Sequence, residues 1–239
     1  MTVRFEELDW SSTPLGEISL RRRLEPTLQV EVYEAKLGDE FLMSSLFTVS
    51  ETALAEIPLG RVSGAGLDVV VGGLGLGYTA HAVLNDERVG SLQVIESLGE
   101  VIGWHERGLL PLSAGLTSDP RCHLIKGDFF SMVATGSPFG PGPAGRHDAI
   151  LVDIDHTPRH VLHPSHAPFY EPEGQRRLAR RLNPGGVFAL WSDDPPDEDY
   201  LAVVEGVFAS CGAHVVTFPN PLTAGEASST VYVATVGRG

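Results

Sequence analysis

The stretch Val69-Val70-Val71-Gly72-Gly73-Leu74-Gly75-Leu76-Gly77-Tyr78 decides the fold class. An apolar strand runs into a glycine-rich turn, and the turn opens a helix. Glycine lets the backbone pass close to a ligand, and the first N–H groups of a helix are free to donate hydrogen bonds. Gly73, Gly75 and Gly77 give the spacing G-x-G-x-G, whereas the dinucleotide pattern needs glycine in place of Tyr78. The turn therefore favours a nucleoside over a pyrophosphate cofactor, and a tight turn without a ligand is the alternative.

Short apolar runs with helical patterns between them surround this turn. The runs are Leu67–Val71, Leu92–Glu96, His123–Lys126, Ala149–Asp153 and Val187–Trp191. Strands that alternate with helices predict an α/β fold with a mainly parallel sheet. Two further runs, His214–Phe218 and Thr230–Thr235, leave no room for a helix between them. We therefore expect these last two strands to be antiparallel.

Acidic residues stand at the ends of three successive predicted strands. Glu96 ends the second strand, Asp128 follows the third in Gly127-Asp128, and Asp153 ends the fourth. The carboxyl ends of parallel strands meet at one edge of an open α/β sheet, where ligands bind. Glu96 is placed to accept hydrogen bonds from ribose hydroxyls, and Asp128 to accept one from an exocyclic amine such as that of adenine. Each acid alone also fits a helix cap or a turn.

The chain divides into two predicted domains. Residues 1–60 form a small β-rich domain, in which the turn residues Lys36–Glu40 predict a hairpin. Residues 61–239 form the nucleoside-binding domain. Within it, the Gly/Pro-rich segment 134–145 predicts a loop without packing residues.

Composition excludes several classes of protein. The chain of 239 residues has 17 Lys and Arg against 31 Asp and Glu, which gives a formal net charge of −14. Such a surface repels phosphate backbones, so we expect no nucleic-acid partner. Two cysteines are too few for a disulfide framework or a cysteine-rich zinc module. Because the sequence shows neither a signal-peptide pattern nor an apolar run of about 18 residues, we expect a cytoplasmic protein without a membrane partner.

Several motifs occur here in an order that one known family shares. They are the glycine turn, Glu96, Gly127-Asp128, Leu151-Val152-Asp153, Pro168-Phe169-Tyr170 and Asn183-Pro184-Gly185-Gly186. Over residues 67–195 the chain resembles the spermidine synthase (polyamine aminopropyltransferase) group of the class I S-adenosylmethionine-dependent methyltransferase fold. The resemblance implies a Rossmann-like, seven-stranded, mostly parallel sheet with an antiparallel last strand, preceded by a small N-terminal β-rich domain. It also implies a homodimer.

The resemblance further implies a sulfonium nucleoside as the ligand, either S-adenosylmethionine or its decarboxylated form. The product is then S-adenosylhomocysteine or methylthioadenosine. The residues that the resemblance assigns to this ligand are Gly72, Gly73, Gly75, Gly77, Glu96, Gly127, Asp128 and Asp153.

The sequence departs from the family's pattern in the half of the site that holds the amine. Spermidine synthases usually carry an aspartate at the position of Gly75, where it helps to hold the aminopropyl group. Their Tyr-His pair after the N-terminal hairpin has no counterpart here. In place of two aspartates three apart and then proline, the chain has Asp153-Ile154-Asp155-His156-Thr157-Pro158. The nucleoside half of the motif set therefore transfers, whereas the acceptor half does not.

The loop after the fourth predicted strand carries the candidate catalytic residues Asp153, Asp155 and His156. Asp153 is expected nearest the reacting carbon, and Asp155 or His156 is expected to accept a proton from an amine. Asp155, Tyr170 and Asp193 are the candidate residues for binding a cationic acceptor. For Asp193 the alternative is a place at the start of the next helix, where negative charge is favoured.

Histidines are frequent in the same loop. They are His156, His160, His163 and His166. Prolines interrupt the helix that would bring them onto one face, so we expect no metal site.

Three functions follow as hypotheses from these observations. The first is an aminopropyl transfer from decarboxylated S-adenosylmethionine to an amine. The second is methyl transfer from S-adenosylmethionine to a small acceptor, which Gly75 favours because it leaves room for the methionine carboxylate. The third is a non-catalytic relative that binds a nucleoside.

Overall fold

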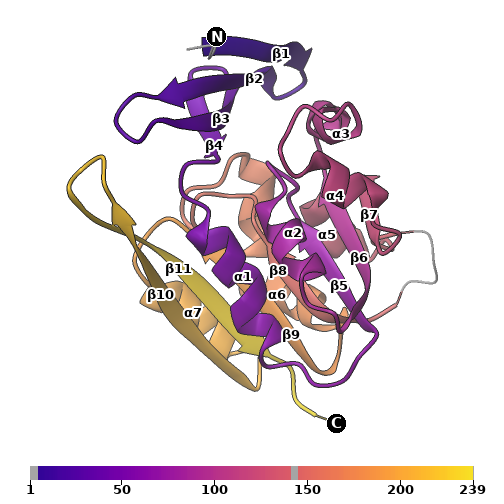
Figure 1. Ribbon diagram of the computed structural model, residues 1–239. Coiled ribbons are helices and arrows are strands. Elements are labelled where there is room, and N and C mark those ends of the chain that lie inside the picture. Colours follow the sequence, from indigo (N-terminus) through magenta and orange to yellow (C-terminus); the bar gives the residue numbers. More distant parts are fainter. Residues whose placement is uncertain (1–4, 141–144, 239) are drawn as a thin grey trace.

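A seven-stranded sheet forms the larger part of the computed structural model, which describes residues 5–140 and 145–238 (Figure 1). The strand order is β10-β11-β9-β8-β5-β6-β7. The strands are β5 (Leu67–Gly72), β6 (Val89–Glu96), β7 (Cys122–Lys126), β8 (His147–Val152), β9 (Leu182–Ser192), β10 (Ser210–Asn220) and β11 (Gly225–Thr235).

In the part of the sheet ordered β9-β8-β5-β6-β7, each strand is parallel to its neighbours. Strand β11 is antiparallel to both β9 and β10. The β10–β11 hairpin pairs Ser210 with Thr235 at one end and Asn220 with Gly225 at the other. The connection is too short for a helical crossover, which forces the antiparallel pairing. The predicted fold class and the reversed last strand are both confirmed.

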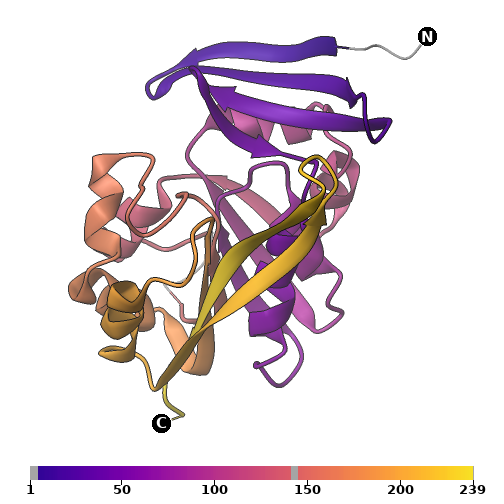
Figure 2. The same cartoon turned by 90° about the vertical axis from the view of Figure 1, so that its left-hand side faces the viewer.

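Helices cover both faces of this sheet (Figures 1 and 2). One face carries α1 (Val49–Leu59), α2 (Tyr78–Leu84), α3 (Gly99–Glu106) and α4 (Ser113–Ser118). The other face carries α5 (Phe129–Thr135), the 3-10 helix η1 (Pro164–Phe169), α6 (Pro172–Ala179) and α7 (Glu198–Glu205).

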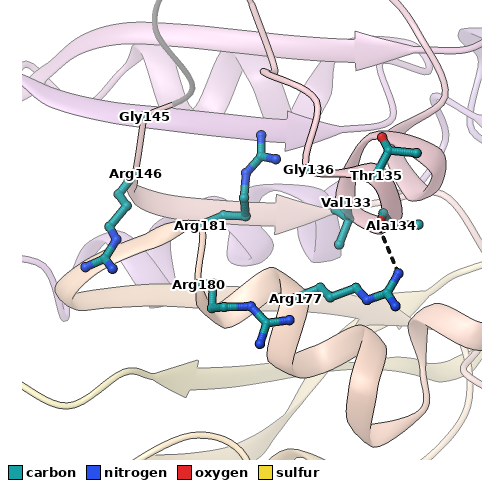
Figure 3. A pocket seen from close by; sticks show the side chains of 9 residues that line it. All are labelled: Val133, Ala134, Thr135, Gly136, Gly145, Arg146, Arg177, Arg180 and Arg181. Atoms are coloured by element: carbon teal, nitrogen blue, oxygen red, sulfur yellow. Dashed lines mark hydrogen bonds between the residues drawn. The ribbon is translucent and has the colours of Figure 1, made fainter.

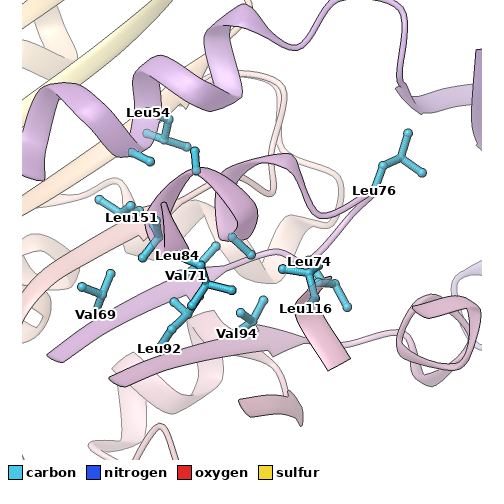
Figure 4. Packing of buried hydrophobic residues seen from close by; sticks show 14 of the residues in the cluster. Leu54, Val69, Val71, Leu74, Leu76, Leu84, Leu92, Val94, Leu116 and Leu151 are labelled. Atoms are coloured by element: carbon cyan, nitrogen blue, oxygen red, sulfur yellow. The ribbon is translucent and has the colours of Figure 1, made fainter. Parts of the chain in front are cut away.

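Alternate residues of the central strands supply the two hydrophobic cores. Val69 and Val71 of β5 pack in the first core, and Val70 packs in the second. This is the period of two that a strand buried on both faces must have. Figure 4 shows the first core, to which Leu54 of α1 and Leu116 of α4 also contribute. The packing fixes where β5 ends and therefore where the glycine turn begins.

The N-terminal part forms a separate four-stranded antiparallel sheet in the order β1-β2-β3-β4. Its strands are β1 (Phe5–Thr13), β2 (Gly16–Glu25), β3 (Val30–Leu37) and β4 (Glu40–Ser44). The predicted hairpin is the β3–β4 pair, in which Gly38 has a φ of 58°.

This small sheet lies over the carboxyl ends of the parallel strands (Figure 2). Trp104 of α3 donates its indole N–H to a carboxylate oxygen of Asp9 at 2.7 Å. His156, in the loop after β8, lies 3.2 Å from a carboxylate oxygen of Glu40. The small sheet therefore covers the edge where the predicted ligand residues lie.

The domain boundary predicted at residue 60 stays a prediction. Helix α1 precedes that boundary, yet it packs on the larger sheet through Leu54 and Leu59. This packing favours a boundary between β4 and α1.

The Gly/Pro-rich segment 134–145 differs from its prediction in one respect. Phe139 is buried and stacks on Phe129 with ring centroids 5.3 Å apart, so the segment does contribute a packing residue. Residues 141–144 of that segment lie outside the described residues. Among the described helices, none combines the length and the apolar character that a membrane crossing needs.

Candidate functional site

The glycine turn joins β5 to α2. It needs glycines because of its backbone conformation and because neighbouring parts of the protein leave little room for side chains. Gly73, Gly75 and Gly77 have φ values of 95°, 51° and 92°, in the left-handed region that favours glycine. A Cβ atom on Gly73 would lie 2.0 Å from the carbonyl oxygen of Asp153, and one on Gly72 would lie 2.8 Å from the ring of Phe129. The turn is therefore pressed against the ends of β8 and α5.

Gly75 and Gly77 lie against other parts of the fold. A Cβ on Gly75 would lie 3.2 Å from the sulfur of Met43 in the N-terminal sheet. The carbonyl oxygen of Gly75 is 3.0 Å from Nε2 of His105, a buried side chain of α3. Burial lowers the pKa of His105, which favours a neutral ring that donates from Nε2 to this carbonyl. The turn is thus held from two sides.

Glu96 connects the end of β6 to the glycine turn. Its carboxylate accepts hydrogen bonds from the backbone N–H of Leu74 at 3.1 Å and from that of Leu98 at 2.8 Å. The side chain is buried, and burial raises the pKa of Glu96, while the backbone donors oppose this rise. The acid predicted to bind a ribose therefore lies directly under the turn.

Asp153 lies at the end of β8, next to the turn, as the sequence predicts. Its carboxylate accepts a hydrogen bond from the hydroxyl of Thr79 in α2 at 2.7 Å, and its backbone N–H donates to the carbonyl of Gly72 at 2.8 Å. Burial raises the pKa of Asp153.

Glu51, in the first turn of α1, is a second acid of this site that the sequence argument missed. Burial, together with the nearby charge of Asp153, raises the pKa of Glu51 to about 8. In the sequence Glu51 is an ordinary acid near a helix start, a position where acids are common. Its neighbourhood depends on how α1 packs on the face of the sheet against β8 and β9, which no local sequence pattern indicates.

Gly127 and Asp128 follow β7, one strand further along the same edge. Asp128 is the N-cap of α5, and its side chain accepts a hydrogen bond from the backbone N–H of Ser131 at 3.1 Å. The side chain is exposed. The capping role that the sequence left open is therefore present, and the carboxylate is still exposed to solvent.

Asp155 differs most from its predicted role. It is 1% exposed, and both carboxylate oxygens accept hydrogen bonds within the loop. One oxygen accepts from the backbone N–H of Leu162 at 2.7 Å and lies 2.8 Å from Nδ1 of His166. The other accepts from the hydroxyl of Tyr170 at 2.8 Å. The Asp155 carboxylate, with both oxygens hydrogen-bonded, therefore holds the loop together. The prediction was different: a base or a binding group whose carboxylate faces an amine.

Tyr170, predicted to bind the acceptor, is therefore buried in the same loop cluster. Burial and the charge of Asp155 raise the pKa of Tyr170 well above its ordinary value. Its hydroxyl donates a hydrogen bond to Asp155 and is therefore not a free donor for the acids beside the glycine turn.

His156 and Asp193 come together by a backbone contact. The N–H of Asp193 donates to the carbonyl oxygen of His156 at 2.8 Å, and the Asp193 side chain is exposed. Asp193 does not start the next helix, because Asp197 caps α7 by accepting from the N–H groups of Asp199 and Tyr200. That alternative was wrong, since α7 begins at Glu198, beyond Pro195 and Pro196.

The histidines of the loop have different partners. His166 contacts Asp155, His156 contacts Glu40, and His163 caps η1 by accepting from the N–H of Ser165. Within residues 5–140 and 145–238, no three His, Cys, Asp or Glu side chains gather as a metal site.

The geometry therefore brings together the glycine turn, Glu96, Asp153 and Glu51, with Asp128 along the same edge. Buried carboxylates beside a turn with left-handed glycines suit a ligand that offers hydroxyl groups and a positive charge. Asp155 and Tyr170 stand apart as a loop cluster.

Comparison with known proteins shows which fold the chain shares. No family model matches the chain. A spermine synthase of Arabidopsis thaliana is 28% identical over 175 residues, which cover 70% of this chain and 45% of that protein. The chain thus spans less than half the length of this curated relative.

Two solved structures cover 98% of this chain, and in each the match covers 73% of the solved chain. The spermidine synthase from Thermotoga maritima has a TM-score of 0.71 at 17% identity. A spermidine synthase in complex with the transition state analogue AdoDATO has a TM-score of 0.72 at 18% identity. Both solved structures and the curated relative point the same way, so this chain has the spermidine/spermine synthase-like aminopropyltransferase fold.

Proposed function

We propose that this chain binds decarboxylated S-adenosylmethionine at the carboxyl ends of β5 to β8 and transfers its aminopropyl group to an amine. The observation that carries the proposal is the pair of partly buried acids Glu51 and Asp153, the second of which is hydrogen-bonded through its backbone to Gly72 at the glycine turn. A solved spermidine synthase of the same fold was captured with the analogue AdoDATO, which supports a site of this kind.

The nucleoside half of the proposed site uses the acids at the ends of β6 and β7. Glu96 would accept hydrogen bonds from the ribose hydroxyls, and its contact with Leu74 ties that interaction to the shape of the turn. Asp128 would accept from the exocyclic amine of adenine, since its side chain is exposed at the start of α5. Gly72, Gly73, Gly75, Gly77 and Gly127 would shape the backbone around the ligand.

The aminopropyl half would rest on Glu51 and Asp153 in place of the acid missing at Gly75. The decarboxylated donor ends in an ammonium group, whereas S-adenosylmethionine carries a carboxylate there as well. Two partly buried carboxylates would attract the ammonium and repel the carboxylate. A bound cation also favours the ionised form of Glu51, whose pKa lies near 8 without it.

In the proposed reaction the neutral amine nitrogen of the acceptor attacks the carbon next to the sulfonium. The carbon–sulfur bond breaks, and its electron pair stays on sulfur, so that methylthioadenosine leaves. The new carbon–nitrogen bond releases one proton. The ammonium group of the donor would leave Glu51 ionised, so that its carboxylate would be able to accept this proton. Asp155 is less suitable, since three hydrogen bonds already occupy its oxygens.

Methyl transfer from S-adenosylmethionine is the second candidate. Gly75 favours it, because no carboxylate projects from the turn and Met43 is the neighbour at this position. A homodimer and a cytoplasmic location also stay predictions. So do the binding of a cationic acceptor by Asp193 and the acceptance of a proton by His156.

Single-turnover transfer from the two labelled donors to a pool of polyamines and small amines tests the proposal. We expect transfer from the decarboxylated donor, and a loss of about 10²-fold or more in the Glu51→Gln variant, which lacks the proposed proton acceptor. Methyl transfer from S-adenosylmethionine alone would establish the second candidate instead. Transfer from neither donor, with methylthioadenosine still bound, would point to a non-catalytic relative.

A further inference from the structure

Four arginines surround a cavity at the amino ends of β8 and β9, on the opposite side of the larger sheet from the candidate site. The cavity has a volume of about 380 Å³. Arg146 precedes β8, Arg181 precedes β9, and Arg177 and Arg180 lie in and just after α6 (Figure 3). The remaining lining comes from Gly145 and from residues 133–136 at the end of α5. The amino ends of β8 and β9 lie here, so the cavity is separated by the length of the strands from Asp153.

The charge of this cavity is opposite to that of the whole chain. No acidic residue belongs to the lining among the described residues, although the chain carries a net charge of −14. The nearest acid, Glu173 of α6, is half-exposed and is shared by Arg176, Arg177 and Arg180 at 3.3 to 3.6 Å. Exposed pairs of this length contribute little, so Glu173 leaves the guanidinium groups available to a competing anion.

Two of the arginines have structural contacts that use only part of their donors. Arg177 donates to the carbonyl of Ala134 at 2.8 Å, as the dashed line in Figure 3 shows. Arg181 donates to the carbonyl of Ser137 at 2.7 Å and lies over the ring of Phe139. A guanidinium has five N–H donors, so most remain free for a ligand.

Arg181 gives a second sign of an incomplete site. It is 8% exposed, and its Nε has no hydrogen-bond partner in the described part of the chain. Burial lowers the pKa of Arg181, which shows that its charge is desolvated at a cost. A desolvated guanidinium is normally paired with an anion, and an anion held by the remaining N–H groups of Arg181 would offset this cost.

We propose that this cavity binds a compact polyphosphate group, such as the phosphate chain of a nucleoside di- or triphosphate. Guanidinium groups recognise phosphate oxygens through paired, charge-assisted hydrogen bonds. Four guanidinium groups offer more hydrogen-bond donors than a single phosphate dianion uses. The volume of the cavity is that of a small-molecule pocket. The charge of the rest of the surface disfavours a long polyanion such as RNA.

Calorimetric titration with phosphate, pyrophosphate and tripolyphosphate at low salt tests the proposal. We expect affinity to rise along this series, with tripolyphosphate at least tenfold tighter than phosphate. The double variant Arg146→Gln with Arg180→Gln should weaken tripolyphosphate binding by at least tenfold. Both side chains are exposed, so the variant is expected to fold, and Arg180→Gln alone serves as a milder second variant.

Arg176→Gln is the matched control. Arg176 lies on the same helix and contacts the same Glu173, but it does not line the cavity. It should therefore bind tripolyphosphate within about twofold of the wild type. Absence of tripolyphosphate binding, or equal losses in Arg176→Gln and Arg180→Gln, would overturn the proposal. Tight binding of a single-stranded oligonucleotide without tripolyphosphate binding would assign the arginines to nucleic acid instead.

Discussion

Single residues decide which charge the proposed active site carries. Glu51 and Asp153 are both desolvated, and each disfavours ionisation of the other. Like charges in a buried site separate the protonation of two acids, so that one stays protonated near neutral pH. The proposed cationic ligand would reverse this balance, so we expect binding of an ammonium group to release a proton from the pair.

The raised pKa of Glu51 predicts how stability depends on pH. The folded pKa of about 8 lies above the ordinary value of 4.5, so the folded state holds a proton that the unfolded state has lost. The free energy of unfolding is therefore highest below pH 4.5 as far as this group is concerned, and it falls as pH rises toward 8. Glu51→Gln removes this contribution to the free energy of unfolding. We therefore expect the fall in that free energy between pH 5 and pH 8 to be smaller in the variant by on the order of 3 kcal/mol.

Urea denaturation of the wild type and Glu51→Gln across that pH range checks this prediction. Glu56→Gln on the same helix is the control, because Glu56 is exposed. Parallel pH curves for the wild type and Glu51→Gln would show that Glu51 ionises normally.

At the scale of elements, the glycine turn is the rigid part of the site. Gly73→Ala places a Cβ on the carbonyl of Asp153 in a backbone conformation with φ of 95°. We expect a loss of about 3 kcal/mol or more in the free energy of unfolding, since neither backbone can move easily. Gly103→Ala in α3 is the control, where a Cβ meets nothing within 4 Å and alanine should stabilise by up to about 1 kcal/mol. Equal stabilities of the two variants would contradict the close approach of the turn to β8.

The loop after β8 is a second element with a testable role. Asp155→Asn keeps the size of the side chain but puts an amide donor among three groups that donate to it. We expect it to lower the free energy of unfolding by about 2–3 kcal/mol, and Tyr170→Phe to lower it by about 1 kcal/mol. Nucleoside affinity should stay within about twofold. An Asp155→Asn variant that is fully stable but inactive would return Asp155 to the catalytic role.

At the scale of the whole molecule, sequence patterns were sufficient to predict those parts of the fold that depend on residues close together in the chain. The strand that ends in Gly72, the antiparallel last strand and the β3–β4 hairpin follow from periodicity and turn residues. The position of Glu96 beneath the turn also follows, because successive parallel strands end at one edge.

Features that depend on packing between distant segments were out of reach. Glu51 meets Asp153 only because α1 crosses the sheet, and Asp155 is saturated only because η1 folds back over it. The arginine cavity likewise joins the start of β8 to the end of α6. Such contacts leave no periodic trace in the sequence.

Calorimetric titration with methylthioadenosine tests whether a nucleoside binds beside the glycine turn. This ligand is the part that both candidate donors share. We predict binding to the wild type and a loss of about 1.5–3 kcal/mol in Glu96→Gln, because a charged acceptor for the ribose hydroxyls is removed. The variant keeps one acceptor oxygen, enough for the N–H group of either Leu74 or Leu98 but not both, so thermal denaturation must first show that it is folded. No binding to the wild type, or equal binding to a folded Glu96→Gln, would contradict the account.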